Sequence, residues 1–569
     1  MSFFTKKTKY FLPAIVVLAA WLLFFGLNRA DIQHDDAIYS FRAVGYLDYT
    51  DSQLQTTPIQ WFGTIPWWSK LSFHDAPPLV FIIQHLFFSL FGVSVFTARL
   101  PFALAGLGSV VLLYLLARQI YNQKVAWISS LILTVFSYHI WASRVGYLEP
   151  IALFFILLTG YLFFVSLVDH KKFILFGISL GLTLLTKYTV FFLIPVLFFY
   201  LLLTQRKILA SKYFVSSIAI AVLIFSPVIF YNLKVFQARG HFDLQFATLL
   251  GQKMSDWPGL AGMSGGSGNY LQQFFDFWQQ FSGYYSLPIY ILIVASILYL
   301  VVNFVSRYKE PKDLFLVLVI LFASLEFSLI GSSARFVSLL NPFFALVLAL
   351  GLIKSFELIN GNQVGSLEIF KKGFYFLFLA VVFGFEIFYS LNTNIFSQPL
   401  GEAGKYYSVS RWENGGFNQL NDYLGKIIKP DTLSRKSIAS LDDLKVDVSK
   451  DLQGKDFFVY DPNLNWFSAL WYFRQFSVYY GVNFVSAADL SLAIPNTNWF
   501  EFFKNYGVKN LYYIRGANNL VFDPGRLEPA NQAAASKLES IFKNNNASLN
   551  SVNNKNNQLA FKIYKLILN

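Results

Sequence analysis

Two adjacent carboxylates, Asp35 and Asp36, follow the first apolar segment of the chain after a short polar linker. A positioned carboxylate can accept a proton from an attacking group or bind a hard cation. The apolar segment itself, residues 11–27, carries no charge, whereas residues 6–9 on its other flank include three lysines. Because cationic flanks stay inside, we expect the acid pair to lie just beyond the membrane face opposite the N-terminus.

The rest of the chain is too long and too apolar for one ordinary soluble domain. Its 569 residues are 55% hydrophobic and 14% charged, with a mean hydropathy of +0.48. Long apolar runs in this composition predict a polytopic α-helical membrane protein. The absence of cysteine excludes disulfides and thiolate metal sites. The net charge of +13 is spread over short loops, so it indicates topology rather than a nucleic-acid partner.

Apolar segments predict about 11 transmembrane helices. They are residues 11–27, 100–116, 125–141, 151–168, 173–186, 190–203, 214–231, 285–305, 314–330, 336–353 and 374–391. With the N-terminus cytoplasmic, every short inside loop is basic, as the positive-inside rule expects. Counting the apolar residues 77–91 as a span would put these basic loops outside, so we expect that segment to lie on or partly in the outer leaflet.

This topology divides the chain into a transmembrane domain, residues 1–391, and a soluble extracytoplasmic domain, residues 392–569. Two large outside loops are expected at residues 31–99 and 234–283. In the C-terminal domain, strand-like and helix-like patterns alternate and predict a small α/β fold. The strands are expected at 456–460, 510–514 and 559–567, the helices at 499–505 and 533–543, and a loop at the Asn-rich residues 544–557.

Many ionisable side chains fall at the predicted outer face. They are Asp35, Asp36, His74, Asp75, Arg144, Glu149, Lys187, His241 and Arg335. Glu326 and Glu386 fall inside predicted spans, where charge is costly and usually faces an interior cavity, although either could instead reach the interface. A carboxylate in an outside loop is most often simply solvated, and Asp51 and Asp243 suit that interpretation. Lys187 suits it least, because its turn is too short to leave the lipid boundary.

Several different short motifs follow one another along the chain on this topology. They are Asp35-Asp36 with Tyr39, Asp75-Ala76-Pro77-Pro78-Leu79, Phe91-Gly92-Val93-Ser94, Ala98-Arg99-Leu100-Pro101, Arg144-Val145-Gly146-Tyr147-Leu148-Glu149-Pro150, Leu184-Leu185-Thr186-Lys187, and later Arg335-Phe336 and Asn341-Pro342. The order resembles the membrane glycosyltransferases that take a sugar from a polyprenyl phosphate, which include protein O-mannosyltransferases and aminoarabinose transferases acting on lipid A. The resemblance covers roughly residues 1–355, and the C-terminal domain shows no motif.

The resemblance implies a GT-C-like fold, a cell-membrane location and a transferase working on the extracytoplasmic face. It makes Asp35 the candidate base that activates the acceptor, with Asp36 in place of the family's Glu. Further acids that match the family's catalytic motifs are Asp75 and Glu149. The implied substrate-binding residues are Tyr39, Lys187, Arg144, Arg335 and His241. Asp35, His74, Asp75 and His241 have ligand types for a divalent cation, which similar enzymes can hold there, but their spacing forms no metal motif.

Two positions depart from the aminoarabinose enzymes. Ala76 stands where those enzymes have Lys, and Ile38 stands where they have Arg. Both basic residues are implicated in holding the lipid phosphate, so aminoarabinose transfer to lipid A is not expected. Phosphate contact then falls to Lys187, Arg144 or Arg335, which the sequence does not rank.

The expected chemistry is one displacement at the anomeric carbon, which inverts that centre. It needs a base for the acceptor, cations for the leaving phosphate and an apolar groove for the polyprenyl tail. The acceptor could be a protein, a lipid or a glycan, and the sugar a hexose or a pentose. The alternative is a transporter or flippase that uses the buried acids for coupling. Such proteins often have internal repeats with matching broken helices, and this chain shows no such symmetry.

Overall fold

The computed structural model describes residues 10–258, 270–306, 311–330, 333–359, 366–412, 414–444, 452–494 and 498–568. Part of the predicted second outside loop, residues 259–269, lies outside this described range. The chain forms two compact units. The first, here called the helical unit, comprises Met1–Leu27, Lys70–Ile83 and Arg99–Arg411. The second, the α/β unit, comprises Asn28–Ser69, Gln84–Ala98 and Trp412–Asn569.

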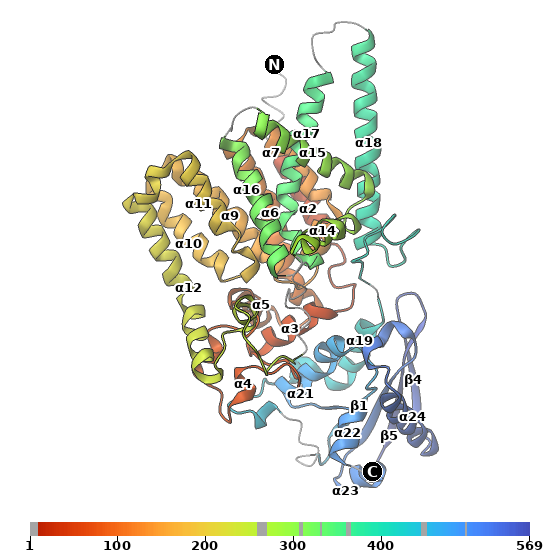
Figure 1. The fold of residues 1–569 in the computed structure, drawn as a ribbon. Coiled ribbons are helices and arrows are strands. Elements are labelled where there is room, and N and C mark those ends of the chain that lie inside the picture. Colours follow the sequence, from red (N-terminus) through yellow and green to blue (C-terminus); the bar gives the residue numbers. More distant parts are fainter. Residues whose placement is uncertain are drawn as a thin grey trace. The chain divides into compact units, whose positions relative to one another are not determined.

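Apolar helices joined by short turns build the helical unit (Figure 1). Its α-helices are α2 (Phe11–Phe24), α6 (Val95–Ile120), α7 (Gln123–Val135), α8 (Ser137–Ser143), α9 (Glu149–Val168), α10 (Phe173–Leu184), α11 (Leu193–Thr204), α12 (Lys212–Arg239), α13 (Leu244–Leu249), α14 (Tyr270–Gln280), α15 (Leu287–Ser306), α16 (Pro311–Ile330), α17 (Asn341–Ile359) and α18 (Ser366–Asn394). Short 3-10 segments include η3 (His170–Lys172), η4 (Tyr188–Val190), η5 (Arg206–Ala210), η7 (Phe281–Gly283) and η8 (Ala334–Leu340).

Among the described residues, seven helices are long and apolar enough to cross a membrane. They are Val95–Ile120, Glu149–Val168, Lys212–Arg239, Leu287–Ser306, Pro311–Ile330, Arg335–Ile359 and Ile369–Asn394. The bent pair α7–α8 would make an eighth span, and Phe11–Phe24, Leu79–Phe91 and Tyr188–Thr204 are shorter apolar helices. The chain is therefore a multi-pass helical membrane protein, while the count of eleven spans stays a prediction.

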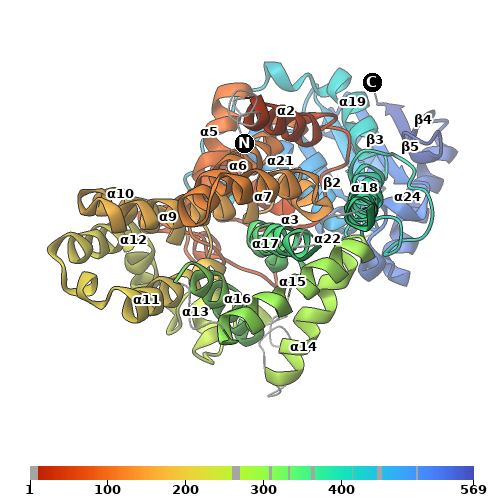
Figure 2. The same cartoon turned by 90° about the horizontal axis from the view of Figure 1, so that it is seen from above.

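Helices α9, α10 and α12 pack closely together in the helical unit (Figure 2). Gly177 of α10 makes this possible, because a Cβ there would lie 2.4 Å from the carbonyl oxygen of Ser217 on α12. Between α9 and α10, the hydroxyl of Thr159 bonds Ser179 at 2.7 Å and Thr183 at 2.8 Å. Small residues and hydroxyl contacts are the usual means of joining helices in lipid.

The predicted span at residues 125–141 is broken. Helices α7 and α8 meet at an angle of 66° around Phe136. Two side chains of α18 bond the backbone at the break: Ser390 Oγ donates to the carbonyl of Val135 at 2.6 Å, and Glu386 accepts the amide of Ser137 at 3.0 Å. Glu386 also accepts the amide of Ser286 at 3.3 Å, just before α15. This buried carboxylate therefore caps two helix starts, and it does not snorkel to the interface.

In the α/β unit, five strands form one sheet in the order β2-β1-β3-β5-β4 (Figure 1). The strands are β1 (Asp456–Tyr460), β2 (Asn483–Ser486), β3 (Asn510–Gly516), β4 (Ser548–Asn553) and β5 (Leu559–Ile567). Strand β1 is parallel to β2 and β3, whereas β5 is antiparallel to β3 and β4.

Helices and short segments complete the α/β unit. They are α3 (His34–Gly45), α4 (Pro58–Trp61), η2 (Trp67–Lys70), α5 (Leu79–Phe91), which the helical unit shares, α19 (Phe417–Ile428), η9 (Pro430–Thr432), η10 (Asp442–Leu444), α20 (Trp466–Ala469), the π-helical turn η11 (Leu470–Arg474), α21 (Gln475–Tyr480), α22 (Ala487–Ala493), α23 (Trp499–Asn505), η12 (Asn519–Val521), η13 (Pro524–Arg526) and α24 (Pro529–Asn544). One face of the sheet buries apolar side chains against α22, α23 and α24. The other face stacks aromatic rings, with Phe458 against Phe484 and Tyr460 against Phe473.

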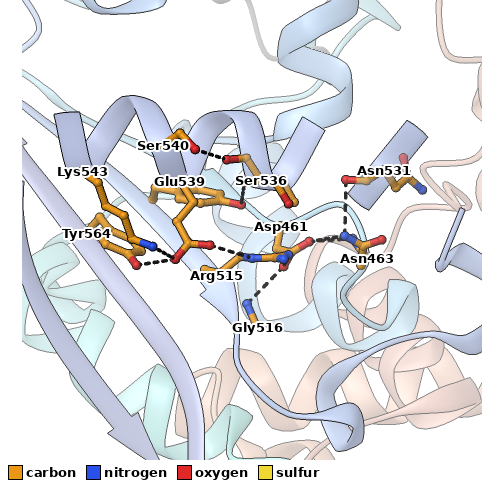
Figure 3. Close-up of polar contacts among 12 residues, drawn as sticks. Asp461, Asn463, Arg515, Gly516, Asn531, Ser536, Glu539, Ser540, Lys543 and Tyr564 are labelled. Atoms are coloured by element: carbon orange, nitrogen blue, oxygen red, sulfur yellow. Dashed lines mark hydrogen bonds and ion pairs between the residues drawn. The ribbon is translucent and has the colours of Figure 1, made fainter. Parts of the chain in front are cut away.

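An ionic network links the C-terminal ends of β1 and β3 to helix α24 (Figure 3). Arg515 on β3 pairs with Asp461, which directly follows β1, and lies 3.6 Å from a carboxylate oxygen of Glu539 on α24. Burial lowers the pKa of Arg515, but the nearby Asp461 outweighs burial and the net shift is upward. The guanidinium thus stays charged and joins both strands to the covering helix.

Most predicted elements of the C-terminal region are present at their expected positions. Strands β1, β3 and β5 and helices α23 and α24 cover the predicted ranges. The predicted loop at residues 544–557 is wrong, because Ser548–Asn553 form strand β4. The pairing of β4 with β5 overrides a local composition that is typical of turns.

We predict that Glu386→Leu lowers the thermal stability of the detergent-purified protein. The change leaves two buried amides without an acceptor, which costs about 1–3 kcal/mol for each. Glu357→Leu, at an exposed position on α17, is the matched control and should change the denaturation midpoint little. Equal losses in the two variants would contradict the capping role.

Candidate functional site

A buried ionic cluster at one end of the helical unit joins Glu149, Lys187 and Arg335. The Lys187 ammonium donates to a Glu149 carboxylate oxygen, and Arg335 Nε lies 3.7 Å from the same oxygen. The side chains of Lys187 and Glu149 are 10% and 2% exposed, so this pair is shielded from bulk water. Two cationic groups therefore face one carboxylate in a low-dielectric setting, where their interactions are strong.

Helix ends place these three side chains. Glu149 is the first residue of α9, where the positive end of the helix dipole favours a carboxylate. Lys187 is in the extended turn between α10 and η4, and Arg335 lies in η8 just before α17. The ring of Phe336 adds a cation–π surface, 4.6 Å from the Lys187 ammonium.

The Asp75-Ala76-Pro77-Pro78-Leu79 motif lies beside the Lys187 turn. The amide of Leu79 donates to the carbonyl of Leu185 at 3.1 Å, two residues before Lys187. The carbonyl of His74 accepts the amide of Leu244 at 2.8 Å, which adds the segment around α13 to the same region. The helical unit thus gathers the predicted residues His74, Asp75, Glu149, Lys187, His241 and Arg335 from segments that are far apart in sequence.

Asp243 is a member of this region that the sequence interpretation assigned wrongly to solvent. It is fully buried and accepts bonds from the hydroxyl of Tyr188, the amide of Phe246 and the side chain of Asn232. The pKa of Asp243 is raised to about 6 overall: burial is the largest cause, the bonds from Tyr188, Phe246 and Asn232 oppose it, and the neighbouring Asp75 adds to it. Its position before the short helix α13 is an N-cap signal, which predicts its bond to the amide of Phe246 but not its burial.

His241 has protein acceptors at both ring nitrogens. Nε2 lies 2.7 Å from Asp256, and Nδ1 lies 2.6 Å from the carbonyl oxygen of Phe242. Both nitrogens therefore act as donors, which describes an imidazolium. Burial lowers the pKa of His241, but the bonds to Asp256 and Phe242 outweigh burial and raise it overall. In this conformation His241 offers no lone pair to a metal ion.

Three of the four predicted metal ligands, His74, Asp75 and His241, belong to the helical unit. The ring of His74 lies 5.9 Å from that of His241, measured between centroids, whereas Asp35 belongs to the α/β unit. Within the described residues, no group of three or more His, Asp or Glu side chains is arranged to hold a metal ion. A divalent cation at Asp35, His74, Asp75 and His241 stays a prediction.

The acid pair occupies the first turn of α3 in the α/β unit. Asp35 is half-buried, while Asp36 is fully buried and 3.4 Å from the Ser40 hydroxyl that donates to it. Ser40 in turn accepts the side-chain amide of Gln84 at 2.9 Å. The two carboxylates therefore have different surroundings, and Asp35 is the one with access to solvent.

The remaining substrate-binding candidates differ in their surroundings. Tyr39 is buried within α3, on the same helix as the acid pair. Arg144 donates to the carbonyls of Leu22 at 2.9 Å, Leu23 at 3.2 Å and Gly26 at 3.2 Å, all at the C-terminal end of α2. A cation at a helix C-terminus is stabilising in itself, so Arg144 already has a structural role.

Part of the sequence is similar to a known family of mannosyltransferases. Residues 75–231 match the model of the dolichyl-phosphate-mannose-protein mannosyltransferase family. YkcB of Bacillus subtilis, provisionally named a mannosyltransferase, is 31% identical over 156 residues, which are 26% of this chain and 21% of that protein. The predicted resemblance to polyprenyl-phosphate-sugar glycosyltransferases is confirmed. The alignments span at most 34% of the length of the curated relatives matched.

Solved structures share the fold at low sequence identity. ArnT from Cupriavidus metallidurans, bound to undecaprenyl phosphate, aligns with a TM-score of 0.52 and 13% identity over 99% of this chain and 98% of that one. The oligosaccharyltransferase of Archaeoglobus fulgidus aligns with a TM-score of 0.51 and 14% identity over 90% of this chain and 70% of that one. The chain therefore has the fold of these membrane proteins.

We predict that Asp243 makes folding stability pH-dependent. Between its ordinary pKa near 3.8 and about 6, the folded protein keeps a proton that the unfolded chain has released. The contribution of Asp243 to stability is therefore greatest below the lower value, and up to about 3 kcal/mol of it is lost as the pH rises through the upper one.

Unfolding in detergent from pH 4 to 7 measures this dependence. Asp243→Asn should remove that component of the profile, whereas the exposed-site control Asp422→Asn should leave it in place. Superimposable profiles for wild type and Asp243→Asn would show that Asp243 does not titrate in this range.

Proposed function

We propose that the chain is a membrane glycosyltransferase that moves a sugar from a polyprenyl phosphate to an acceptor on the extracytoplasmic face. The observation that carries this proposal is the convergence of Lys187 and Arg335 on the buried Glu149, at the ends of apolar helices. Cations held at a membrane boundary suit the phosphate of a lipid whose tail lies in the bilayer. The transporter alternative gains no support from the matched family or from YkcB, both of which are named for mannosyltransferase activity.

In this proposal the two cations bind the donor phosphate. Lys187 and Arg335 stabilise the charge that grows on the phosphate as the glycosidic bond breaks, because preorganised donors need no reorganisation at that moment. Glu149 holds the Lys187 ammonium in place, and its negative charge offsets the repulsion between the cations of Lys187 and Arg335. Arg144 ranks last among the three phosphate candidates, since its guanidinium caps α2.

Asp35 acts as the base. Its carboxylate accepts the proton of the acceptor hydroxyl or amide while the acceptor atom attacks the anomeric carbon, and polyprenyl phosphate leaves. A single displacement without a covalent intermediate inverts the anomeric centre. Asp36, which is buried and bonded by Ser40, supports the turn and does not exchange the proton.

A hexose is the proposed sugar, because residues 75–231 match a mannosyltransferase family. Ala76 and Ile38 stand where the aminoarabinose enzymes have basic residues, which argues against that pentose. The acceptor is a protein, lipid or glycan on the outer face, and the N-terminus lies in the cytoplasm.

We predict that Asp35→Asn lowers sugar transfer by about 10²–10⁴-fold, the range lost with a general base. The assay uses proteoliposomes supplied with a labelled polyprenyl-phosphate hexose and a membrane extract as the source of acceptor. Asp431→Asn, in η9, is the control and should leave transfer unchanged. Wild-type transfer by correctly inserted Asp35→Asn protein would refute the assignment.

We predict that Lys187→Gln and Arg335→Gln raise the KM for the lipid-linked donor about tenfold or more, because each loses a charge-assisted bond to phosphate. Lys187→Gln also leaves Glu149 buried without its partner, so the double variant Glu149→Gln/Lys187→Gln restores a neutral pair. The double variant should still have a high KM. Recovery of donor affinity in it, or an equal rise of KM in Arg144→Gln, would contradict the phosphate role.

A further inference from the structure

The segment that leads into the acid pair is bonded to the C-terminal part of the α/β unit. The side-chain amide of Asn418, on α19, donates to three successive carbonyls: those of Asn28 at 3.2 Å, Arg29 at 3.2 Å and Ala30 at 3.0 Å. Residues 28–30 and 418 are therefore held together although 388 or more positions separate them along the chain. Because one amide contacts three successive carbonyls, it fixes the path of the backbone at residues 28–30 as well as the distance of this segment from α19.

Asp31 continues this attachment. Its carboxylate accepts the amides of Gly416 at 2.9 Å, Phe417 at 3.2 Å and Asn418 at 2.9 Å. These amides form the N-terminus of α19, where backbone donors have no partner within the helix. Asp31 is fully buried, so the three bonds replace its lost hydration. A residue close to the N-terminus in sequence thus caps a helix of the C-terminal region.

Tyr472 bonds both Asn418, in the first turn of α19, and Ile32, the residue that follows Asp31. Its hydroxyl accepts the amide of Ile32 at 2.9 Å and donates to the Asn418 side-chain oxygen at 2.7 Å. The carbonyl of Ile32 accepts the hydroxyl of Ser468 at 3.2 Å. Both backbone groups of Ile32 are therefore bonded to the C-terminal region, three residues before Asp35. Tyr472 and Ser468 are fully buried, so water does not compete for these bonds.

His34 completes the approach to α3. Its backbone has φ +51°, a left-handed conformation that is rare outside glycine, and it follows an extended Gln33. The imidazole stacks on Trp412 at 5.5 Å and lies 5.9 Å from the ring of Phe467, between centroids. A sparsely populated conformation needs support from its surroundings, and the rings of Trp412 and Phe467 contact this otherwise exposed residue. The direction in which α3 starts, and with it the direction of Asp35, depends on this turn.

We propose that Tyr472 and Asn418 are positioning residues for Asp35, so that the C-terminal region sets the geometry of the base. This inference rests on the proposed function of Asp35. Neither residue touches the reacting atoms; each acts through residues 28–34. A small misplacement of a catalytic group costs about 10²-fold in rate, so loss of one bond at Ile32 should be visible in turnover.

Tyr472→Phe tests the proposal, because it keeps the ring and removes only the hydroxyl. We expect kcat to fall about tenfold to hundredfold while the KM for the lipid-linked donor stays unchanged, since the cation pair belongs to the helical unit. Ser468→Ala, which removes one bond to Ile32, should show a smaller fall in kcat. It is a second test of the proposal if Tyr472→Phe does not fold. The control is Tyr506→Phe, at a tyrosine that is 42% exposed.

A double variant separates positioning from general stability. If Tyr472 acts through Asp35, then Tyr472→Phe should cause no further loss in an Asp35→Asn background. A further loss of the same size in that background, or wild-type kcat in Tyr472→Phe, would overturn the proposal.

A labelling experiment distinguishes failure of this inference from failure of the proposed function. The chain has no cysteine, so Asp35→Cys introduces one thiol that reports on the environment of position 35. Its rate of reaction with a maleimide should change several-fold when Tyr472→Phe is added and should not change with Tyr506→Phe. A changed labelling rate, together with an absence of transfer by the protein that keeps Asp35, would refute only the proposed function, whereas an unchanged rate would refute the positioning role.

Discussion

A carboxylate buried at the start of an apolar helix is costly unless a cation accompanies it, and the helical unit is organised around that requirement at Glu149. The cation comes from Lys187, in the turn between α10 and η4. Arg335 approaches the same oxygen from η8. The bond between Leu79 and Leu185 then brings the first-loop motif to this turn. This ion pair, the contact of Arg335 and the backbone bond therefore join segments that are distant in the sequence.

The α/β unit solves the same physical problem with backbone donors. Asp31 is buried against the start of α19, and Glu386 in the helical unit is buried against the starts of α8 and α15. In each case a carboxylate exchanges water for amides that have no partner of their own. These caps determine where helices begin, and at Asp31 the cap also fixes the chain that leads to Asp35.

Periodicity and composition were sufficient to predict the membrane class and most of the C-terminal strands, because both depend on local apolar pattern. The break between α7 and α8 could not be predicted, since Phe136 and Ser137 carry no breaker signal and the support comes from α18. Strand β4 was missed because its support also comes from another segment, the paired strand β5. Lys187 was identified because its turn is short, whereas the burial of Asp243 depends on Tyr188 and Asn232, which no local pattern connects to it.

The proposed transfer requires a single displacement at the sugar, in which Asp35 accepts the acceptor's proton and the cation pair stabilises the leaving phosphate. The most direct measurement is the anomeric configuration of the transferred sugar, determined by NMR on product made by the purified wild-type protein from a polyprenyl-phosphate hexose of known configuration. The account predicts that the product has the inverted configuration and that polyprenyl phosphate is released in equal amount. Retention of configuration, or release of the phosphate without transfer, would contradict it.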